Sequence, residues 1–251
     1  MFALYKNILE DDDVTLIASA TYSSMPIENI LDDKLVKYGR IGDGSQYIQA
    51  TFGSAKSFDA MAIAGWGFSS VVFQASNTAD FSTVLVNTTL ADVYVNPDTS
   101  CGYAFVWLPA AVTAKYVRIV FSGDNKKNVG KIMLGTMKQF PWMESKQKLA
   151  KVTTAKSTRS AGGQLYPGNV GYNARQVEVT FPEYADAGFS LIDDLWQTVK
   201  NKRPFFSVVW DDKQNVSPLL YGALNQDSIE QTATGIPSLP FSSKLNIMEC
   251  F

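Results

Sequence analysis

The side chains available for acid–base and nucleophilic chemistry are restricted in this chain, because it contains no histidine. Histidine is the usual general base, a common metal ligand and the central member of most nucleophilic triads. Carboxylates alone can still hydrolyse glycosidic bonds when two act together. The candidates for that chemistry are Asp43, Asp59, Asp124, Glu178 and Asp211. They show no distinctive spacing, so the chain is predicted not to be an enzyme, and a carboxylate glycosidase or lyase stays as an alternative.

Aromatic side chains are the second group that could act on a ligand. Aromatic rings stack on the apolar faces of sugar rings, and they also fill protein cores. The residues considered for sugar stacking are Trp66, Phe68, Tyr94 and Trp107. Residues of these types are more often core residues, and the sequence leaves both interpretations open.

A basic segment forms the third group. Nine lysines and arginines stand between Lys126 and Arg159, against the single acid Glu144. The candidate interface residues within it are Lys146, Lys148, Lys151, Lys156 and Arg159. The segment is interpreted either as a patch for an acidic partner or as a solvated linker. Its few, clustered aromatic residues do not make a stacking platform, so no nucleic acid is expected as a partner.

Composition sets the broad class of protein. A chain of 251 residues with 46% hydrophobic residues can bury one large core or two modest ones, and its net charge of −2 favours neither nucleic acid nor an anionic membrane. No apolar run is long enough to cross a membrane, and residues 1–6 lead into acidic residues rather than a signal-peptide core. We therefore expect no export signal and no membrane insertion. Cys101 and Cys250 are predicted to be free thiols.

Short β-like runs separated by turns make up the first half of the chain. Tyr47–Phe52 alternates between polar and apolar residues, and residues 59–66 are almost entirely apolar. Residues 70–76 and 116–121 are rich in β-branched and aromatic residues, which favour strands. This pattern predicts a β-sandwich or jelly roll over residues 1–136.

Several motifs in this half resemble the discoidin, or coagulation-factor type C, family. They are Ile30-Leu-Asp32, Tyr47-Ile-Gln-Ala-Thr-Phe-Gly53, Ala114-Lys-Tyr-Val-Arg-Ile-Val-Phe121 and the closing Val129-Gly-Lys-Ile-Met-Leu-Gly135. The resemblance implies a jelly-roll β-sandwich that binds surfaces or glycans through loops at one end. It also implies a calcium ion near the Asp-Gly segment, with Asp32, Asp33 and Asp43 as candidate neighbours. No other cofactor is expected.

The second half predicts an α+β module with one helix. Residues 176–181 alternate strictly, and residues 190–202 place apolar residues at helical spacing, with Ser190 as the expected N-cap. Strands are expected at residues 205–210, 219–224 and 244–251. This module is assigned to residues 166–251, and the basic linker or arm, residues 137–165, belongs with it.

The order of these elements resembles the tail-tube-like fold of tailed-phage tube, distal-tail and baseplate hub proteins. The resemblance is carried by a strand, a helix ending near Lys200, the Pro204-Phe-Phe segment, the Val208-Val-Trp-Asp strand and a C-terminal Glu249-x-Phe. It implies a module that closes into a ring around a tail axis.

Two functional hypotheses follow from the two resemblances. The main expectation is a structural virion component of a phage tail tip or baseplate, assembled in the host cytoplasm, which self-associates into a ring and joins the tail tube to host-recognition proteins. Its partners would be copies of itself, other tail proteins and a host surface glycan. The alternative is a carbohydrate-binding protein of surface attachment.

Overall fold

The protein is mainly β-structure. A computed structural model describes residues 1–90, 94–95, 100–123, 126–141, 143, 148–153, 158–159, 165–166, 173–200, 203–208, 219–235 and 241–250. The described part contains two eight-stranded antiparallel sheets, one separate pair of short strands and one α-helix. None of its helices is long and apolar enough to cross a membrane.

The first sheet has the order β3-β9-β4-β8-β5-β6, with β2 added on β4 and β7 on β8. Its strands are β2 (Val14–Ala18), β3 (Gly39–Ile41), β4 (Gln46–Trp66), β5 (Ser70–Ser76), β6 (Val84–Leu90), β7 (Tyr94–Val95), β8 (Gly102–Ser122) and β9 (Lys127–Gly135). Two short 3-10 helices, η1 (Ile8–Glu10) and η2 (Ile27–Leu31), precede β2 and β3.

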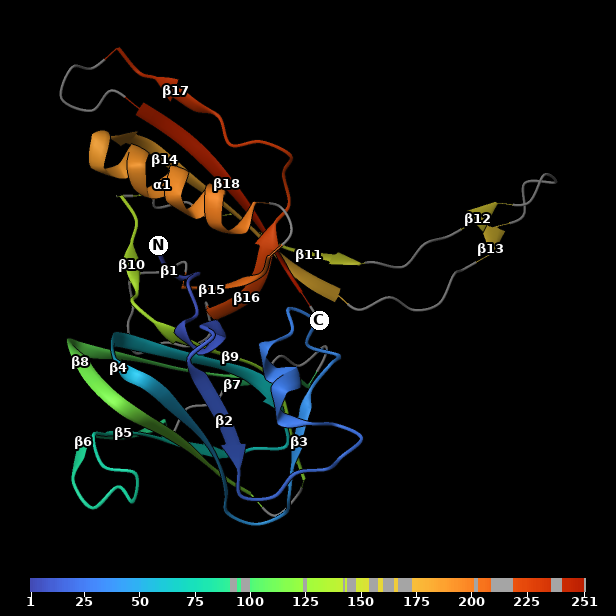
Figure 1. Ribbon diagram of the computed structural model, residues 1–251. Helices are drawn as coiled ribbons and strands as arrows, with labels where there is room; N and C mark the ends of the chain where they lie inside the picture. The colour runs from blue at the N-terminus through green and yellow to red at the C-terminus, as the bar shows by residue number, and fades with distance from the viewer. Residues whose placement is uncertain are drawn as a thin grey trace.

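The first sheet folds back on itself into a β-sandwich because its two longest strands bend. β4 and β8 have 21 residues each, and their pairing is interrupted between Thr51 and Lys56 and again between Phe58 and Ala60. Each strand therefore contributes one half to each layer (Figure 1). Ile48, Phe73 and other apolar residues of both layers form a buried core between them. The predicted sandwich is confirmed.

The second sheet has the order β10-β1-β15-β16-β18-β14-β11, with β17 added on β18. Its strands are β1 (Phe2–Leu4), β10 (Lys138–Gln139), β11 (Lys148–Thr153), β14 (Asn173–Tyr184), β15 (Phe205–Val208), β16 (Leu219–Leu224), β17 (Gln231–Ala233) and β18 (Phe241–Glu249). Helix α1 (Asp186–Val199) lies on one face, where Val179 and Leu245 pack against Leu195 in a buried cluster. The α+β module with one helix is confirmed as predicted.

Helix α1 begins earlier than the sequence predicts. Its N-cap is Ala185 rather than Ser190, and no side chain caps it. The helix starts directly after β14 because Gly188 lets its first turn lie against Tyr184 and Pro141; a Cβ at Gly188 would stand 2.6 Å from the Cγ atom of Pro141. Tertiary packing at the strand end therefore outweighs the side-chain cap.

The two units pack through a third buried cluster, formed by one outer face of the sandwich and the face of the second sheet opposite α1 (Figure 1). Phe2 and Phe206 of the second sheet meet Ala62 and Tyr103 of the sandwich in this cluster. The predicted sandwich range of 1–136 included β1, but β1 pairs with β10 and β15 of the second sheet. The apolar residues at the N-terminus complete that sheet rather than the sandwich.

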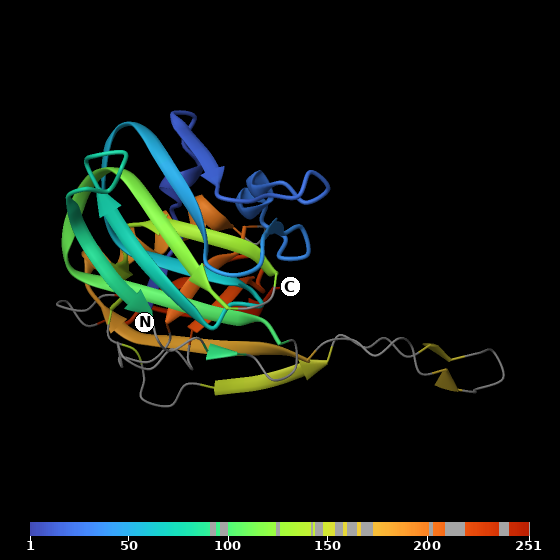
Figure 2. The same cartoon turned by 90° about the horizontal axis from the view of Figure 1, so that it is seen from below.

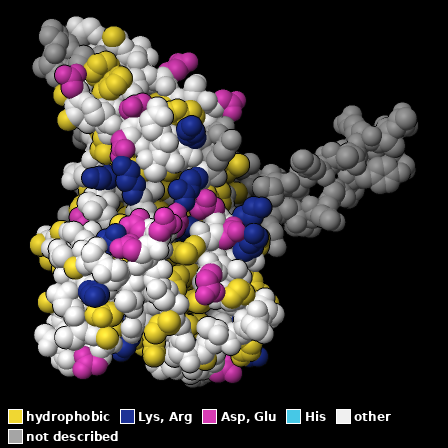
Figure 3. Space-filling model, viewed as in Figure 1, with side chains coloured by type: hydrophobic (Ala, Val, Ile, Leu, Met, Phe, Trp, Pro, Cys, Tyr) yellow, Lys and Arg dark blue, Asp and Glu magenta, His cyan; other side chains and the backbone are white. Residues whose placement is uncertain are grey.

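Charged residues form a belt where the two units meet, and Figure 3 shows acidic and basic side chains gathered there. The ammonium of Lys131, 1% exposed, lies 2.9 Å from Glu10 and 3.1 Å from Asp33. Arg203 of the second unit binds the same two carboxylates. Burial by itself raises the pKa of Glu10, but Lys131, Arg203 and Asn7 together lower it below its usual value.

The segment 137–165 is not a single arm. β10 and β11 are strands of the second sheet, since β10 pairs with β1 and β11 pairs with β14. The separate pair β12 (Thr158–Arg159) and β13 (Leu165–Tyr166) lies away from both sheets (Figures 1 and 2). The sequence could not distinguish these parts because all of them share the same basic composition.

Candidate functional site

The four aromatic residues considered for sugar stacking have different environments. Phe68 is only 8% exposed and packs in the sandwich core against Phe121, with ring centroids 5.6 Å apart. Trp107 lies against Phe2, at 4.7 Å, in the contact between the two units. These two positions are core and contact residues. The backbone of Tyr94 lies in β7, and its side chain is outside the described part of the chain.

Trp66 is the one of the four that joins a larger polar and aromatic group. It ends β4, where it is paired with Asn128 of β9, and Asn128 is in turn paired with Arg40 of β3. Residues at one register position across neighbouring strands point to the same face of a sheet. Arg40, Asn128 and Trp66 therefore form a row across three strands, and all three are partly exposed.

Hydrogen bonds and ring contacts hold this row together. The Nε atom of Arg40 donates to the Oδ1 atom of Asn128 at 2.8 Å. A terminal nitrogen of Arg40 donates to the Tyr38 hydroxyl at 3.3 Å, and its guanidinium stands 5.5 Å from the centre of the Tyr38 ring. The Tyr38 ring meets Trp66 edge-on, with centroids 6.1 Å apart. The planar donors of Arg40 are thus held beside two aromatic rings.

Two further side chains extend the group at the edge of the sheet. Thr21 forms a bridge with Ile41, which places Tyr22 beside Arg40. The ammonium of Lys126 lies 5.3 Å from the centre of the Tyr22 ring. Lys126 is exposed and Tyr22 is partly exposed. We call the set Tyr22, Tyr38, Arg40, Trp66, Lys126 and Asn128 the loop-end surface.

The chemistry of the loop-end surface suits a ligand with both apolar faces and hydroxyl groups. Aromatic rings offer apolar area with little loss of side-chain entropy, because they have few rotatable bonds. Arginine and asparagine supply planar donors and an amide oxygen in fixed positions. The two cations, Arg40 and Lys126, also give this surface a positive charge.

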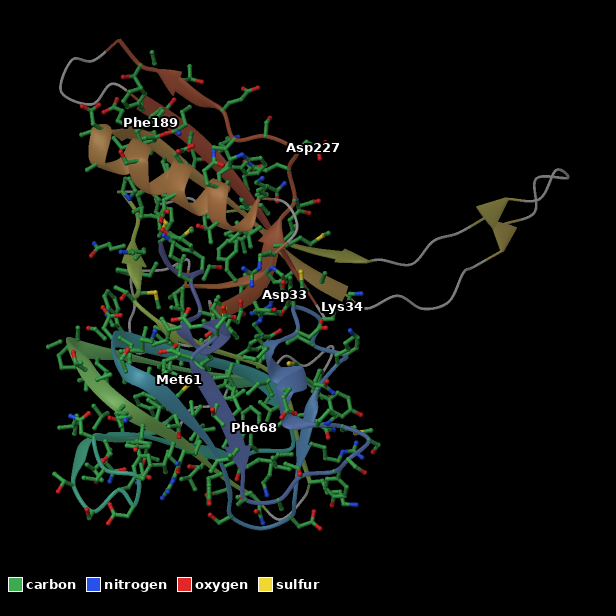
Figure 4. All side chains as sticks on the ribbon, viewed as in Figure 1. Asp33, Lys34, Met61, Phe68, Phe189 and Asp227 are labelled. Carbon is green, nitrogen blue, oxygen red and sulfur yellow. The ribbon has the colours of Figure 1, made fainter. Side chains whose placement is uncertain are left out.

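The acidic residues considered as calcium neighbours do not share their binding partners. Asp32 accepts from Lys37 at 2.8 Å, and this hydrogen bond, with one from the Lys34 backbone, lowers the pKa of Asp32. Asp33 binds Lys131 and Arg203 in the charged belt (Figure 4 labels it there).

Asp43 is exposed in the turn between β3 and β4. Within the described ranges, no group of three or more acidic or cysteine side chains is placed to hold a metal ion. Asp32, Asp33 and Asp43 therefore do not form a joint set of metal ligands.

The five basic residues considered for an interface fall on different parts of the chain. Lys148 and Lys151 belong to β11, and Arg159 belongs to β12. Lys146 and Lys156 lie outside the described residues. For the first three the backbone alone is described.

A second cation–aromatic group lies on the other outer face of the sandwich. The guanidinium of Arg118 stands 4.0 Å from the centre of the Phe81 ring and 4.7 Å from that of Tyr47, and it donates to Gln49. Phe81 has a left-handed backbone, with φ of 57°, which is rare for a bulky side chain. The alternation of Tyr47 and Gln49 along β4 is a sequence signal for this outer face, although Gln49 is buried in it.

Most of the loop-end surface is not apparent from the sequence. Trp66 is its one member among the residues that the sequence marks as candidates for ligand contact. Arg40 and Asn128 are 88 positions apart, and only the pairing of β3 with β9 brings them together.

No protein-family model matches this sequence, and no curated protein does. Solved structures are similar over about half of the chain. One is a Ruminococcus gnavus GH29 fucosidase in complex with fucose, at 14% identity and a TM-score of 0.44, covering 53% of this chain and 27% of the fucosidase. The chain thus spans about a quarter of that enzyme.

Two smaller proteins are similar over most of their own length. The CpGH89CBM32-6 module produced by Clostridium perfringens has 17% identity and a TM-score of 0.40, covering 51% of this chain and 98% of the module. The lectin domain of lectinolysin complexed with Lewis B antigen has 11% identity and a TM-score of 0.41, covering 49% of this chain and 92% of that domain. The structural neighbours of this chain thus include carbohydrate-binding modules and a lectin domain.

Proposed function

We propose that this chain is a glycan-binding protein that recognises a saccharide at the loop-end surface and does not act as a catalyst. The observation that carries the proposal is the row Arg40–Asn128–Trp66 with Tyr38 held against it. In this role the Tyr38 and Trp66 rings contact the apolar face of a sugar ring. Arg40 and Asn128 then hydrogen-bond to its hydroxyl groups.

The absence of histidine supports a binding role over catalysis. Within the loop-end surface the polar groups are donors and amides rather than a pair of carboxylates, which glycoside hydrolysis requires. Recognition without turnover needs only the aromatic and planar polar groups that this surface has.

The test is binding of the full chain to a glycan array, followed by calorimetry with the best ligand. We expect Arg40→Met to weaken binding by roughly tenfold or more, because hydrogen bonds from a charged donor contribute about 1.5–3 kcal/mol. Tyr38→Ala is expected to weaken binding similarly.

Two control variants test whether a loss of glycan affinity is specific to the loop-end surface. Tyr116→Ala changes a partly exposed tyrosine on the other outer face of the sandwich and should leave the affinity unchanged. Lys34→Ala changes an exposed lysine outside the loop-end surface and should also leave the affinity unchanged. An array with no bound glycan, or equal affinities for Arg40→Met and the wild-type chain, would count against this function.

We propose as a second candidate that the chain assembles into a multi-copy structure such as a phage tail tip. The observation that favours it is the strand pair β12–β13, which belongs to neither sheet. An isolated pair of short strands is marginal in water, so an adjoining chain would stabilise it. The neighbours named above include no tail component, and this candidate keeps its basis in the sequence resemblance. Light scattering and negative-stain microscopy of the full chain test it, with closed rings as the expected result.

A further inference from the structure

Lys127 is a fully buried lysine at the turn end of the sandwich. It is the first residue of β9, its side chain is 0% exposed, and its ammonium points at backbone oxygens. The Nζ atom donates to the carbonyl of Gly123 at 2.6 Å and to that of Gly42 at 3.4 Å. It also donates to the carbonyl of Gly44. One cation thus joins the turn between β3 and β4 to Gly123, the residue that directly follows β8.

The three hydrogen bonds explain why a buried charge is tolerated at this position. A lysine ammonium has three donors and no acceptor, and it meets three carbonyl oxygens here. Burial of an ammonium without such partners is strongly unfavourable. Gly44 has φ of 70°, a left-handed conformation that glycine adopts without strain. The backbone of the turn is therefore shaped to present its oxygens to a cation.

We infer that the Lys127 ammonium takes the place of a calcium ion in this turn and makes the fold independent of divalent cations. Backbone carbonyls of a turn are ordinary calcium ligands, and the resemblance noted from the sequence implies an ion near this Asp-Gly segment. The residues present do not fit one. The positive Nζ atom already lies among the carbonyl oxygens of Gly42, Gly44 and Gly123, and in the described part of the chain these three oxygens are fewer than the six to eight that calcium takes.

The built-in cation also positions the loop-end surface. Residues alternate between the two faces of a strand, so Asn128 points away from the interior that Lys127 enters. By tying the Gly42–Gly44 turn to Gly123, Lys127 fixes the start of β9, which carries Asn128 and follows directly on the exposed Lys126. Lys127 is therefore a positioning residue, and its role in the fold does not depend on whether a glycan binds.

The first test compares thermal unfolding of the full chain in calcium and in EDTA. The unfolding temperature of the wild-type chain is expected to be the same in both. An increase of several degrees in calcium would overturn the inference.

The second test replaces the cation. Lys127→Met keeps the apolar stem and removes the charge, leaving three carbonyls without a donor. It is expected to lower the unfolding temperature by about 6–15 °C. Lys34→Met, at an exposed lysine on the same unit (Figure 4), is the matched control and should leave it unchanged. An unchanged unfolding temperature for Lys127→Met would contradict the assigned role.

A third measurement needs no variant and holds even if Lys127→Met fails to fold. Brief acetylation of the native wild-type chain, followed by peptide mass spectrometry, reports the accessibility of each lysine. Lys127 is expected to be protected at least tenfold relative to Lys34, since its ammonium is buried and hydrogen-bonded. Equal acetylation of Lys127 and Lys34 would show that the ammonium is not held in the turn. Neither the acetylation measurement nor the calcium comparison involves a glycan. A result that contradicts the role of Lys127 is therefore independent of whether the chain binds a glycan.

Discussion

Single buried charged residues connect distant parts of this structure. Glu249 of β18 is fully buried and accepts from Arg175 of β14 at 2.6 Å. Tyr103 of β8 donates to the same carboxylate at 2.9 Å, which connects the sandwich to the second sheet. Burial raises the pKa of Tyr103, so its hydroxyl remains a donor. Nearby, burial raises the pKa of Cys101 to about 12, which makes this thiol unreactive as a nucleophile.

We predict that Glu249→Gln destabilises the protein by about 3–5 kcal/mol, because it removes the negative charge that is paired with the buried Arg175 guanidinium. Chemical denaturation followed by fluorescence measures the change. The matched control is Glu178→Gln, which removes an exposed pair with Lys244 and should cost less than about 1 kcal/mol. Equal losses of unfolding free energy in Glu249→Gln and Glu178→Gln would contradict the prediction that burial raises the cost of removing the charge.

The elements of the second sheet show which part of the basic segment belongs to the fold. β11 and β14 are paired up to Thr153 and Asn173, so their ends lie side by side. The residues between these ends, 154–172, include the separate pair β12–β13. A two-residue turn can join paired strand ends of this kind.

We predict that replacing residues 154–172 by Asn-Gly leaves the fold intact, because β11 and β14 keep their pairing. The circular dichroism spectrum and unfolding temperature should stay close to those of the full chain. If the protein assembles through this segment, the shortened chain should be monomeric by light scattering under conditions in which the full chain forms rings. Rings of the shortened chain would exclude a role for the segment in assembly.

The two units pack together as one body because they share a buried core. Phe206 is fully buried in the cluster between them and lies 4.9 Å from Tyr221, whose hydroxyl donates to the backbone of Asp33. The charged belt, which includes Glu10, Lys131 and Arg203, lies beside this contact. Apolar packing and ion pairs therefore join the same two surfaces.

At this scale we predict a single calorimetric transition for the wild-type chain. Phe206→Ala should lower the stability by about 3–5 kcal/mol, since it opens a cavity in the shared cluster. Hydrogen exchange should then increase in β4 and β8 of the sandwich as well as in β15 and β16. Phe189→Ala, at a helix residue that is 37% exposed, is the control (Figure 4). Increased exchange confined to the second sheet would show that the units unfold separately.

The classes of element and most strand positions follow from local sequence patterns. Alternation along residues 176–181 predicted which side chains are buried, and along residues 47–52 it did so except at Gln49, which is 6% exposed. Leu245, Ile247 and Glu249 alternate along the last strand in the same way, and all three are buried. The start of helix α1 was predicted at Ser190 and lies at Asp186, because packing of Gly188 rather than a cap sets it.

The places of the functional groups depend on contacts between distant parts of the chain. Trp66 and Trp107 look alike in sequence and both pack against the cluster between the two units, yet Trp66 also meets Tyr38 in the loop-end surface, whereas Trp107 lies against Phe2. Lys127 reads as one more charge in a basic segment, but the fold encloses it among three carbonyls. Strand pairing and sheet packing act between residues far apart in the chain. Local sequence patterns therefore do not indicate which faces of the sheets become covered by other parts of the chain.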